Sequence, residues 1–97
     1  MEVFDHALSQ LERSMTISTK RQAVIAQNIA NAKTAGYEAM EFDEQLMKAV
    51  KRQENKDVIL EDELSALTDN SVKYSSYVRL MSSKIAILKS IASQGRK

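Results

Sequence analysis

The 97-residue sequence lacks proline and cysteine and contains only two glycines, Gly36 and Gly95. Without cysteine, the chain can form neither a disulfide framework nor a thiolate metal site. Without proline, a helix can run far before a residue interrupts it. Three tyrosines, two phenylalanines and no tryptophan give little bulk for a globular core. The composition therefore favours long helices that pack along a narrow line of contact.

Targeting and membrane-spanning segments are also missing from the pattern. The first residues show no cationic start followed by an apolar run, which is the form of a secretory signal peptide. No stretch approaches the roughly 20 apolar residues that a membrane helix needs. We therefore expect no direct membrane insertion, and any export must proceed without a cleaved signal peptide.

Charge is unevenly distributed along the chain, although the net charge is only +1. Residues 1–36 carry +1, residues 37–70 carry −6 and residues 71–97 carry +6. A basic block can bind nucleic acid or an anionic membrane surface. Here its cations are spread around the predicted helix, which favours a solvated face or pairing with the acidic block. We expect no nucleic-acid partner.

Apolar residues recur at alternating steps of four and three over residues 4–32, the pattern of a helix that packs along one line. This first stripe comprises Phe4, Leu8, Leu11, Met15, Ser18, Gln22, Ile25, Ile29 and Ala32. Its polar members, Ser18 and Gln22, either interrupt the apolar contact slightly, fix the register of the paired helices or make the pairing locally less stable. Gly36 can adopt the left-handed backbone that ends a helix. Residues 1–36 are therefore predicted to form the N-terminal helix and its turn.

A second stripe with the same spacing predicts a C-terminal helix over residues 58–93, continuous through 68–71. It comprises Leu60, Leu64, Leu67, Ser71, Tyr74, Val78, Met81, Ile85, Leu88 and Ala92. Between the stripes, residues 37–57 are predicted to form a short acidic helix and loop, partly flexible. The helix rests on the spacing of Phe42, Leu46, Met47 and Val50, and residues 52–56 read as an exposed loop.

These elements predict one all-α domain spanning residues 1–97. The two long terminal helices pair as an antiparallel, coiled-coil-like hairpin around the short acidic element. Two helices alone leave much of each apolar face uncovered. The isolated chain should therefore self-associate or remain partly unfolded, which points to assembly.

Catalytic chemistry has little support in the sequence. His6 is the only histidine, so neither a transition-metal site nor an activated serine is expected. The carboxylates Asp43, Glu44, Glu61, Asp62 and Glu63 occur in runs, and a thin helical hairpin offers no pocket that would tune one of them. No glycine-rich phosphate loop is present. We expect no enzyme activity, no cofactor and no metal.

One decapeptide carries a family resemblance: Asn28-Ile29-Ala30-Asn31-Ala32-Lys33-Thr34-Ala35-Gly36-Tyr37. It resembles the motif that closes the N-terminal helix of the flagellar axial proteins of the rod, hook and hook junction. That motif usually reads Asn-x-Ala-Asn-x-x-Thr-Pro-Gly-Tyr, and this chain departs from it only at Ala35, where proline is usual. Further along, residues 69–74 and 81–85 are similar to the C-terminal helix of proximal rod proteins.

The resemblance implies a structural subunit of the flagellar basal-body rod, located outside the inner membrane. It would be exported by the flagellar type III apparatus and assemble through its terminal helices. Its partners would be copies of itself, other rod proteins, the export apparatus and the base of the basal body. The motif residues implied to act in assembly are Asn28, Ile29, Ala30, Asn31, Thr34, Gly36 and Tyr37.

Several alternatives stay open at this point. Asn28 and Asn31 either hydrogen-bond to backbone or to neighbouring subunits, or they are exposed polar residues near a helix end. Tyr37 either anchors the turn or contacts another subunit. The chain could be another rod protein or, from a different class, a cytoplasmic helical adaptor or secretion chaperone that binds a client helix. An interfacial amphipathic helix over residues 71–97 is a further reading.

Overall fold

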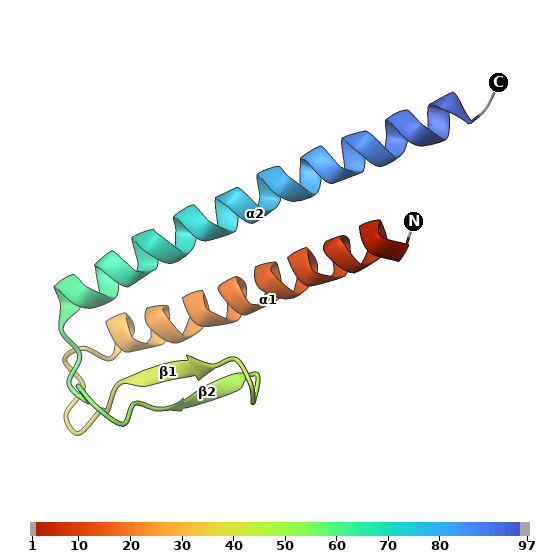
Figure 1. The fold of residues 1–97 in the computed structure, drawn as a ribbon. Helices are drawn as coiled ribbons and strands as arrows, with labels where there is room; N and C mark the ends of the chain where they lie inside the picture. Colours follow the sequence, from red (N-terminus) through yellow and green to blue (C-terminus); the bar gives the residue numbers. More distant parts are fainter. Residues whose placement is uncertain (1, 96–97) are drawn as a thin grey trace.

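Two long helices and a small β-hairpin make up the fold of this chain in a computed structural model, which describes residues 2–95, with side chains from Asp5 onward. The order is α1 (Glu2–Ala30), β1 (Met40–Asp43), β2 (Lys48–Lys51) and α2 (Leu60–Gln94). Helices α1 and α2 run antiparallel, as Figure 1 shows. The predicted pairing of two terminal helices is therefore present, but the two strands correct the all-α class to a mostly helical one.

Helix α1 ends at Ala30, and a defined turn then redirects the chain. The Tyr37 N–H donates to the Thr34 carbonyl oxygen at 3.2 Å, and Gly36, the third residue of this turn, has a φ of 76°. A hydrogen bond across four residues with a positive φ at the third position describes a type II turn. Glycine suits that position because it has no Cβ to strain the left-handed backbone.

The segment predicted as a short helix is instead an antiparallel hairpin. Its register pairs Met40 with Lys51 and Asp43 with Lys48. Asp43 Oδ1 closes the connection by accepting hydrogen bonds from the backbone N–H groups of Gln45 and Leu46, both at 2.9 Å. The connection also needs a left-handed residue, and Met47 takes that conformation with a φ of 55°. The helical prediction from Phe42, Leu46, Met47 and Val50 is wrong.

Helix α2 is continuous over 35 residues, and Thr68–Ser71 do not interrupt it. Thr68 Oγ1 donates to the Leu64 carbonyl oxygen at 3.1 Å, so its hydroxyl is satisfied within the helix and does not compete with it. Figure 1 shows the C-terminal turns of α2 extending past the start of α1.

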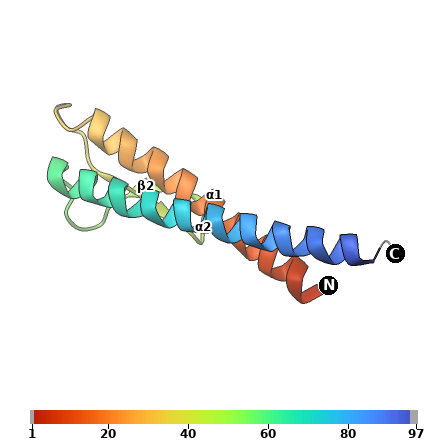
Figure 2. The same cartoon turned by 90° about the horizontal axis from the view of Figure 1, so that it is seen from above.

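The molecule is elongated, with extents of 66 × 24 × 15 Å and a radius of gyration of 18.1 Å. A compact chain of this length would have a radius of gyration of about 13 Å. The helices lie against each other and cross in the view from above (Figure 2). The hairpin lies beside α1 in Figure 1. The solvent-accessible surface of 7240 Å² exceeds the roughly 5,600 Å² typical of a monomer of this mass. The exposed surface includes large apolar side chains of α2, among them Leu60, Leu64 and Val78.

Candidate assembly site

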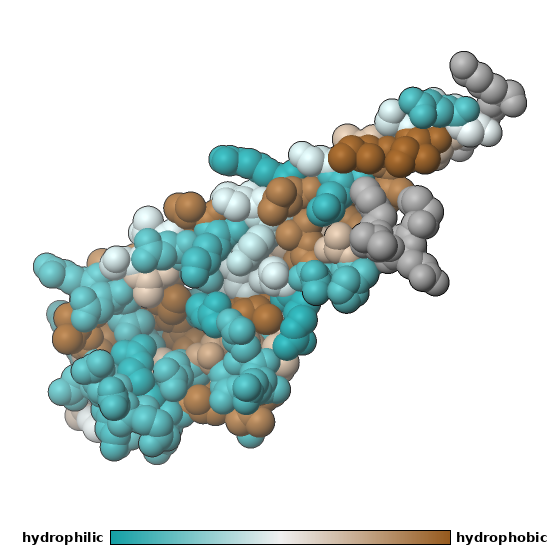
Figure 3. Space-filling model, viewed as in Figure 1, coloured by the Kyte–Doolittle hydropathy of each residue, from teal (hydrophilic) through white to brown (hydrophobic). Residues whose placement is uncertain are grey.

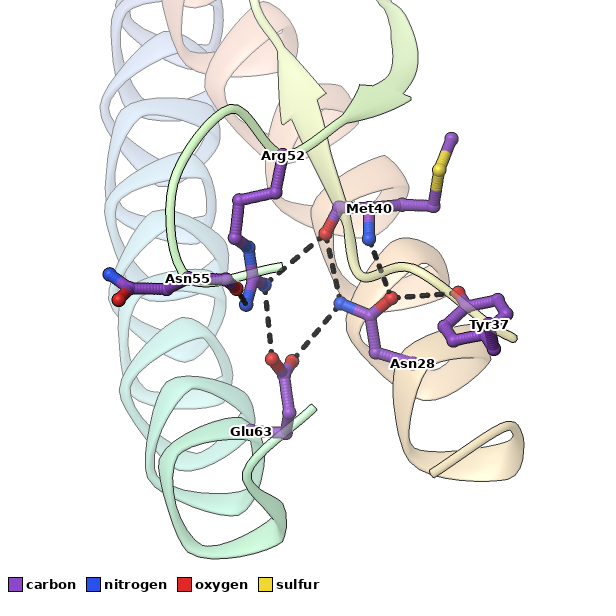
Figure 4. Close-up of polar contacts among 6 residues, drawn as sticks. All are labelled: Asn28, Tyr37, Met40, Arg52, Asn55 and Glu63. Atoms are coloured by element: carbon purple, nitrogen blue, oxygen red, sulfur yellow. Dashed lines mark hydrogen bonds and ion pairs between the residues drawn. The ribbon is translucent and has the colours of Figure 1, made fainter. Parts of the chain in front are cut away.

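The side chain of Asn28 is the centre of a buried polar cluster where α1 meets the hairpin and α2 (Figure 4). It is fully buried. Its Nδ2 donates to the Met40 carbonyl oxygen at 2.9 Å and to Glu63 Oε2 at 3.3 Å. Its Oδ1 accepts from the Tyr37 hydroxyl at 2.8 Å and from the Met40 N–H at 2.9 Å. All four hydrogen-bonding positions of the amide are thus used.

The charge of Glu63 is buried beside that amide and is neutralised by Arg52. Glu63 is only 3% exposed, and Arg52 Nη2 donates to its Oε1 at 3.0 Å. Arg52 also donates to the carbonyl oxygens of Met40 at 3.2 Å and Asn55 at 3.4 Å. A buried carboxylate is tolerated only when a partner and further hydrogen bonds replace water. Arg52, which the sequence pattern placed in an exposed loop, therefore supplies the positive charge that balances Glu63.

Tyr37 completes the cluster from the turn that follows α1. Burial raises the pKa of Tyr37 above its ordinary value of 10.0, the negative charge of Glu63 raises it further, and the positive charge of Arg52 opposes them. The phenol is therefore protonated at neutral pH and acts as a donor to Asn28. We call Asn28, Tyr37, Met40, Arg52 and Glu63 the closed-end cluster.

The other motif residues shape the end of α1. Asn31 Nδ2 donates to the Gln27 carbonyl oxygen at 2.9 Å, and Asn31 Oδ1 accepts from the Thr34 hydroxyl at 3.1 Å. The Gln27 carbonyl oxygen also accepts from the Asn31 N–H at 3.1 Å, so Asn31 binds the last turn of α1 through both its backbone and its side chain. Ile29 is half-buried and Ala30 is exposed. The motif thus divides into inward hydrogen bonding by Asn28 and Tyr37, and turn formation by Asn31, Thr34 and Gly36.

A second buried polar contact lies near the middle of the helix pair. Ser18 and Asn70 are each 3% exposed. The Ser18 hydroxyl donates to Asn70 Oδ1 at 3.1 Å, and Asn70 Nδ2 donates to the Ser18 carbonyl oxygen at 2.8 Å. Gln22, expected beside Ser18 in the stripe, is exposed. On α2 the buried polar residue is Asn70, while the neighbouring Ser71, the polar member of the predicted stripe, is exposed.

The predicted stripe residues divide into two groups by burial. Those at least half-buried are Leu8, Leu11, Met15, Ile25, Ile29, Leu67, Met81 and Leu88. The large apolar members left exposed all lie on α2 and are Leu60, Leu64, Tyr74, Val78 and Ile85. Side chains 2–4, and with them Phe4, lie outside the described residues. The structure brings the first group together and leaves the second, which we call the exposed stripe, on the surface.

Helix α2 presents a different line of residues to α1, because Glu63 and Asn70 take positions that the sequence pattern gave to Leu64 and Ser71. The exposed stripe consequently lies beside the contact line. Tyr74 borders a groove of about 470 Å³ with Met15, Thr19 and Met81, and no hairpin residue lines it. The hairpin lies on the other side, where Phe42 and Glu44 line separate hollows with Ala66 and Tyr77. We call the groove side the open face.

The described part of the chain offers little else that could form a site. It contains no group of three or more His, Cys, Asp or Glu residues placed to hold a metal ion. Within the same residues, neither helix has the length and apolarity required to cross a membrane.

Sequence reasoning did not identify Arg52, Glu63 and Asn70 as buried partners. Glu63 lies in an acidic first helical turn, where a carboxylate is expected to face solvent and stabilise the helix dipole. Its partner Asn28 lies 35 residues earlier, and Ser18 lies 52 residues before Asn70. No local pattern signals such pairs.

No protein-family model and no curated protein matches this sequence.

Proposed function

We propose that this chain is a structural subunit of the bacterial flagellar basal-body rod, similar to the proximal rod protein known as flagellar basal-body rod protein B. It would leave the cytoplasm through the flagellar type III apparatus and assemble through its two terminal helices. The observation that carries the proposal is the decapeptide at residues 28–37, which resembles the axial-protein motif at every defined position except Ala35.

The closed-end cluster gives the motif a physical role that supports this proposal. Asn28 and Tyr37 connect the end of α1 to β1 and α2, and Gly36 supplies the left-handed residue that brings Tyr37 back to the cluster. A subunit that assembles through paired termini needs those termini held in one register, and this cluster provides such a constraint.

The uncovered surface is a second supporting observation. The exposed stripe and an accessible surface well above that of a compact monomer suit a subunit whose packing is completed by neighbours. Large exposed apolar surface in a small protein commonly marks an interaction site.

Gene deletion with complementation tests the proposal. Motility and purified basal bodies are examined after deletion and after return of wild type, Gly36→Val or Gly36→Asn. No atom lies within 4 Å of a Cβ placed at Gly36, so valine adds only backbone strain, which asparagine largely avoids. We expect loss of the rod, full rescue by wild type, substantial rescue by Gly36→Asn and poor rescue by Gly36→Val.

The alternatives give different results in the same strains. A rod subunit remains in purified basal bodies, whereas a cytoplasmic adaptor or secretion chaperone stays in the cell extract bound to an export substrate. Intact flagella in the deletion strain would overturn the rod proposal and favour the adaptor. Another rod protein, such as rod protein C, would be indicated if basal bodies in the deletion strain stop at a different level of the rod.

A further inference from the structure

We infer that the open face of the free subunit binds a second copy of this chain in antiparallel orientation, forming a closed two-fold dimer. This inference goes beyond the proposed function and does not depend on it, because it rests on the surface and charge of α2 alone. The two copies would pack their exposed stripes against each other, with the two-fold axis passing between Tyr74 and Ser75.

The exposed stripe is long, apolar and turned away from the hairpin. Its five members are between 37% and 49% exposed, from Tyr74 at 37% to Leu60 at 49%. Successive members are separated by four, ten, four and seven residues. Each of these separations is a sum of threes and fours, so the five side chains share one face of the helix. Figure 3 shows further apolar surface along the C-terminal half of α2. Covering this face requires an element as long as α2 itself.

The uncovered area is large enough for a stable dimer. The accessible surface of 7240 Å² exceeds that of a compact monomer by about 1,700 Å². A standard protein interface buries about 800 Å² on each partner. The excess of the whole molecule is therefore about twice what one partner of a standard interface contributes.

Charge selects the antiparallel orientation. The start of α2 is acidic, with Asp57 just before it and Glu61 and Asp62 in its first turn, whereas from residue 71 onward it carries cations, among them Lys73, Arg79 and Lys89. Two parallel copies in register would place like charges side by side. The antiparallel arrangement places Leu64 opposite Ile85 of the second copy and Glu61 close to Lys89 of the second copy. Opposite charges then meet at both ends of the interface.

A staggered parallel arrangement also brings opposite charges together but covers too little of the stripe. Sliding Glu61 of one copy to Lys89 of the next requires a shift of about 42 Å at 1.5 Å per residue. Helix α2, with 35 residues, is only about 52 Å long. The overlap of about 10 Å would leave most of the stripe uncovered, so the antiparallel dimer is favoured.

The symmetry of this dimer has a consequence for assembly. A two-fold interface uses the same surface on both copies and cannot propagate, whereas a filament needs a heterologous contact. An antiparallel dimer would therefore cover the apolar face of the free protein without starting a polymer.

Cysteine cross-linking tests the geometry directly, because the natural sequence has no cysteine. Tyr74→Cys, Leu64→Cys and Ile85→Cys are prepared separately and oxidised alone and in pairs. We expect Tyr74→Cys to cross-link with itself, and Leu64→Cys to cross-link with Ile85→Cys but not with itself. Self-cross-linking of Leu64→Cys and of Ile85→Cys would indicate parallel copies and overturn the inference. Cross-linking of Leu64→Cys to Ile85→Cys without Tyr74→Cys dimers would indicate parallel copies shifted along their axes and would also overturn it.

Sedimentation measures the association itself, with a matched pair of variants. Leu64→Lys lies on the stripe, whereas Leu46→Lys lies in the hairpin connection at a site that is also exposed. We expect Leu64→Lys to weaken dimerisation about tenfold or more and Leu46→Lys to leave it unchanged, with both variants keeping wild-type helical circular dichroism. Raising salt from about 50 mM to about 500 mM should also weaken the dimer, since the charges are solvent-exposed. A wild-type chain that stays monomeric, or equal effects of the two variants, would overturn the inference.

Discussion

The two ends of this molecule are built in opposite ways. At the closed end, where the chain passes from α1 through the hairpin into α2, the buried side chains Asn28 and Glu63 are polar and fully partnered. At the opposite end, which we call the open end, the second half of α2 exposes apolar side chains such as Ile87 at 51% and Ile91 at 49%. Among the described residues, no buried side-chain nitrogen or oxygen lacks a hydrogen-bond partner.

This difference separates what specifies the fold from what remains available for binding. Hydrogen bonds are directional, so the closed-end cluster accepts one register of α1, hairpin and α2. Apolar contact is not directional, and the open end leaves it incomplete. A subunit of this kind would have its connection fixed by its own residues and its helix packing completed by a partner. The comparison predicts that a polar residue at the closed end matters more to stability than a large apolar residue at the open end.

The largest effect is expected for Asn28→Ala. Alanine removes four hydrogen bonds and leaves the Met40 N–H and one Glu63 oxygen without that partner in a buried site. We expect a loss of about 3–4 kcal/mol in the free energy of unfolding, measured by urea denaturation followed by circular dichroism. Ile87→Ala at the open end is the contrasting variant and should change stability by less than about 0.5 kcal/mol. Equal effects of the two substitutions would remove the basis of the comparison.

A smaller loss in the free energy of unfolding is expected for Arg52→Met, which leaves the Glu63 carboxylate buried without its counter-charge. The loss should be about 2 kcal/mol, because removing one partner of a buried pair costs more than the pair itself contributes. The double variant Arg52→Met with Glu63→Gln should recover more than half of that loss, since the glutamine is neutral and can still accept from Asn28. Additive losses in this double-mutant cycle would show that Arg52 and Glu63 do not act as a pair.

Tyr37 gives the closed end a dependence on alkaline pH. Because folding raises the pKa of this phenol above 10.0, the folded chain holds the proton more tightly than the unfolded chain does. The resulting stabilisation is complete below pH 10 and is lost as the pH rises through the folded pKa. Tyr37→Phe should lose about 1 kcal/mol at neutral pH and show a smaller drop in stability than wild type as the pH is raised above 10.0. An identical drop in wild type and Tyr37→Phe would assign the alkaline effect to other groups.

The two helices could be predicted from the sequence because their signals are local. Apolar spacing and the absence of proline predicted both, and Gly36 marked the turn after α1. The hairpin could not be predicted in this way. Phe42, Leu46 and Val50 share helical spacing, and the left-handed position in the hairpin connection is filled by Met47, a residue that gives no turn signal.

The line of contact on α2 was also beyond the sequence pattern, for an energetic reason. Leu67, Met81 and Leu88 fit both the predicted stripe and the observed contact line. The choice between Leu64 and Glu63 as the neighbouring inward position depends on the hydrogen bonds that Glu63 makes to Asn28 and Arg52. Apolar periodicity alone favours leucine, because it cannot represent a buried carboxylate whose partners lie far along the chain.

The smallest predicted effect concerns Ala35, the departure from the axial-protein motif, and it is a gain in stability. Ala35 is the second residue of the turn from Thr34 to Tyr37, and it is not among the residues with positive φ. Proline is favoured at the second position of a type II turn because its ring fixes φ near the required value. Ala35→Pro should therefore stabilise the fold by about 0.5 kcal/mol, chiefly by restricting the unfolded chain.

Thermal unfolding of Ala35→Pro against wild type measures this difference. Ala32→Pro, just before the turn, serves as a destabilising control because the Ala32 N–H donates to the Ile29 carbonyl oxygen at 3.2 Å. Destabilisation by Ala35→Pro as well would mean that this turn tolerates only the alanine form, and that its geometry differs from the proline-containing turn of the motif it resembles.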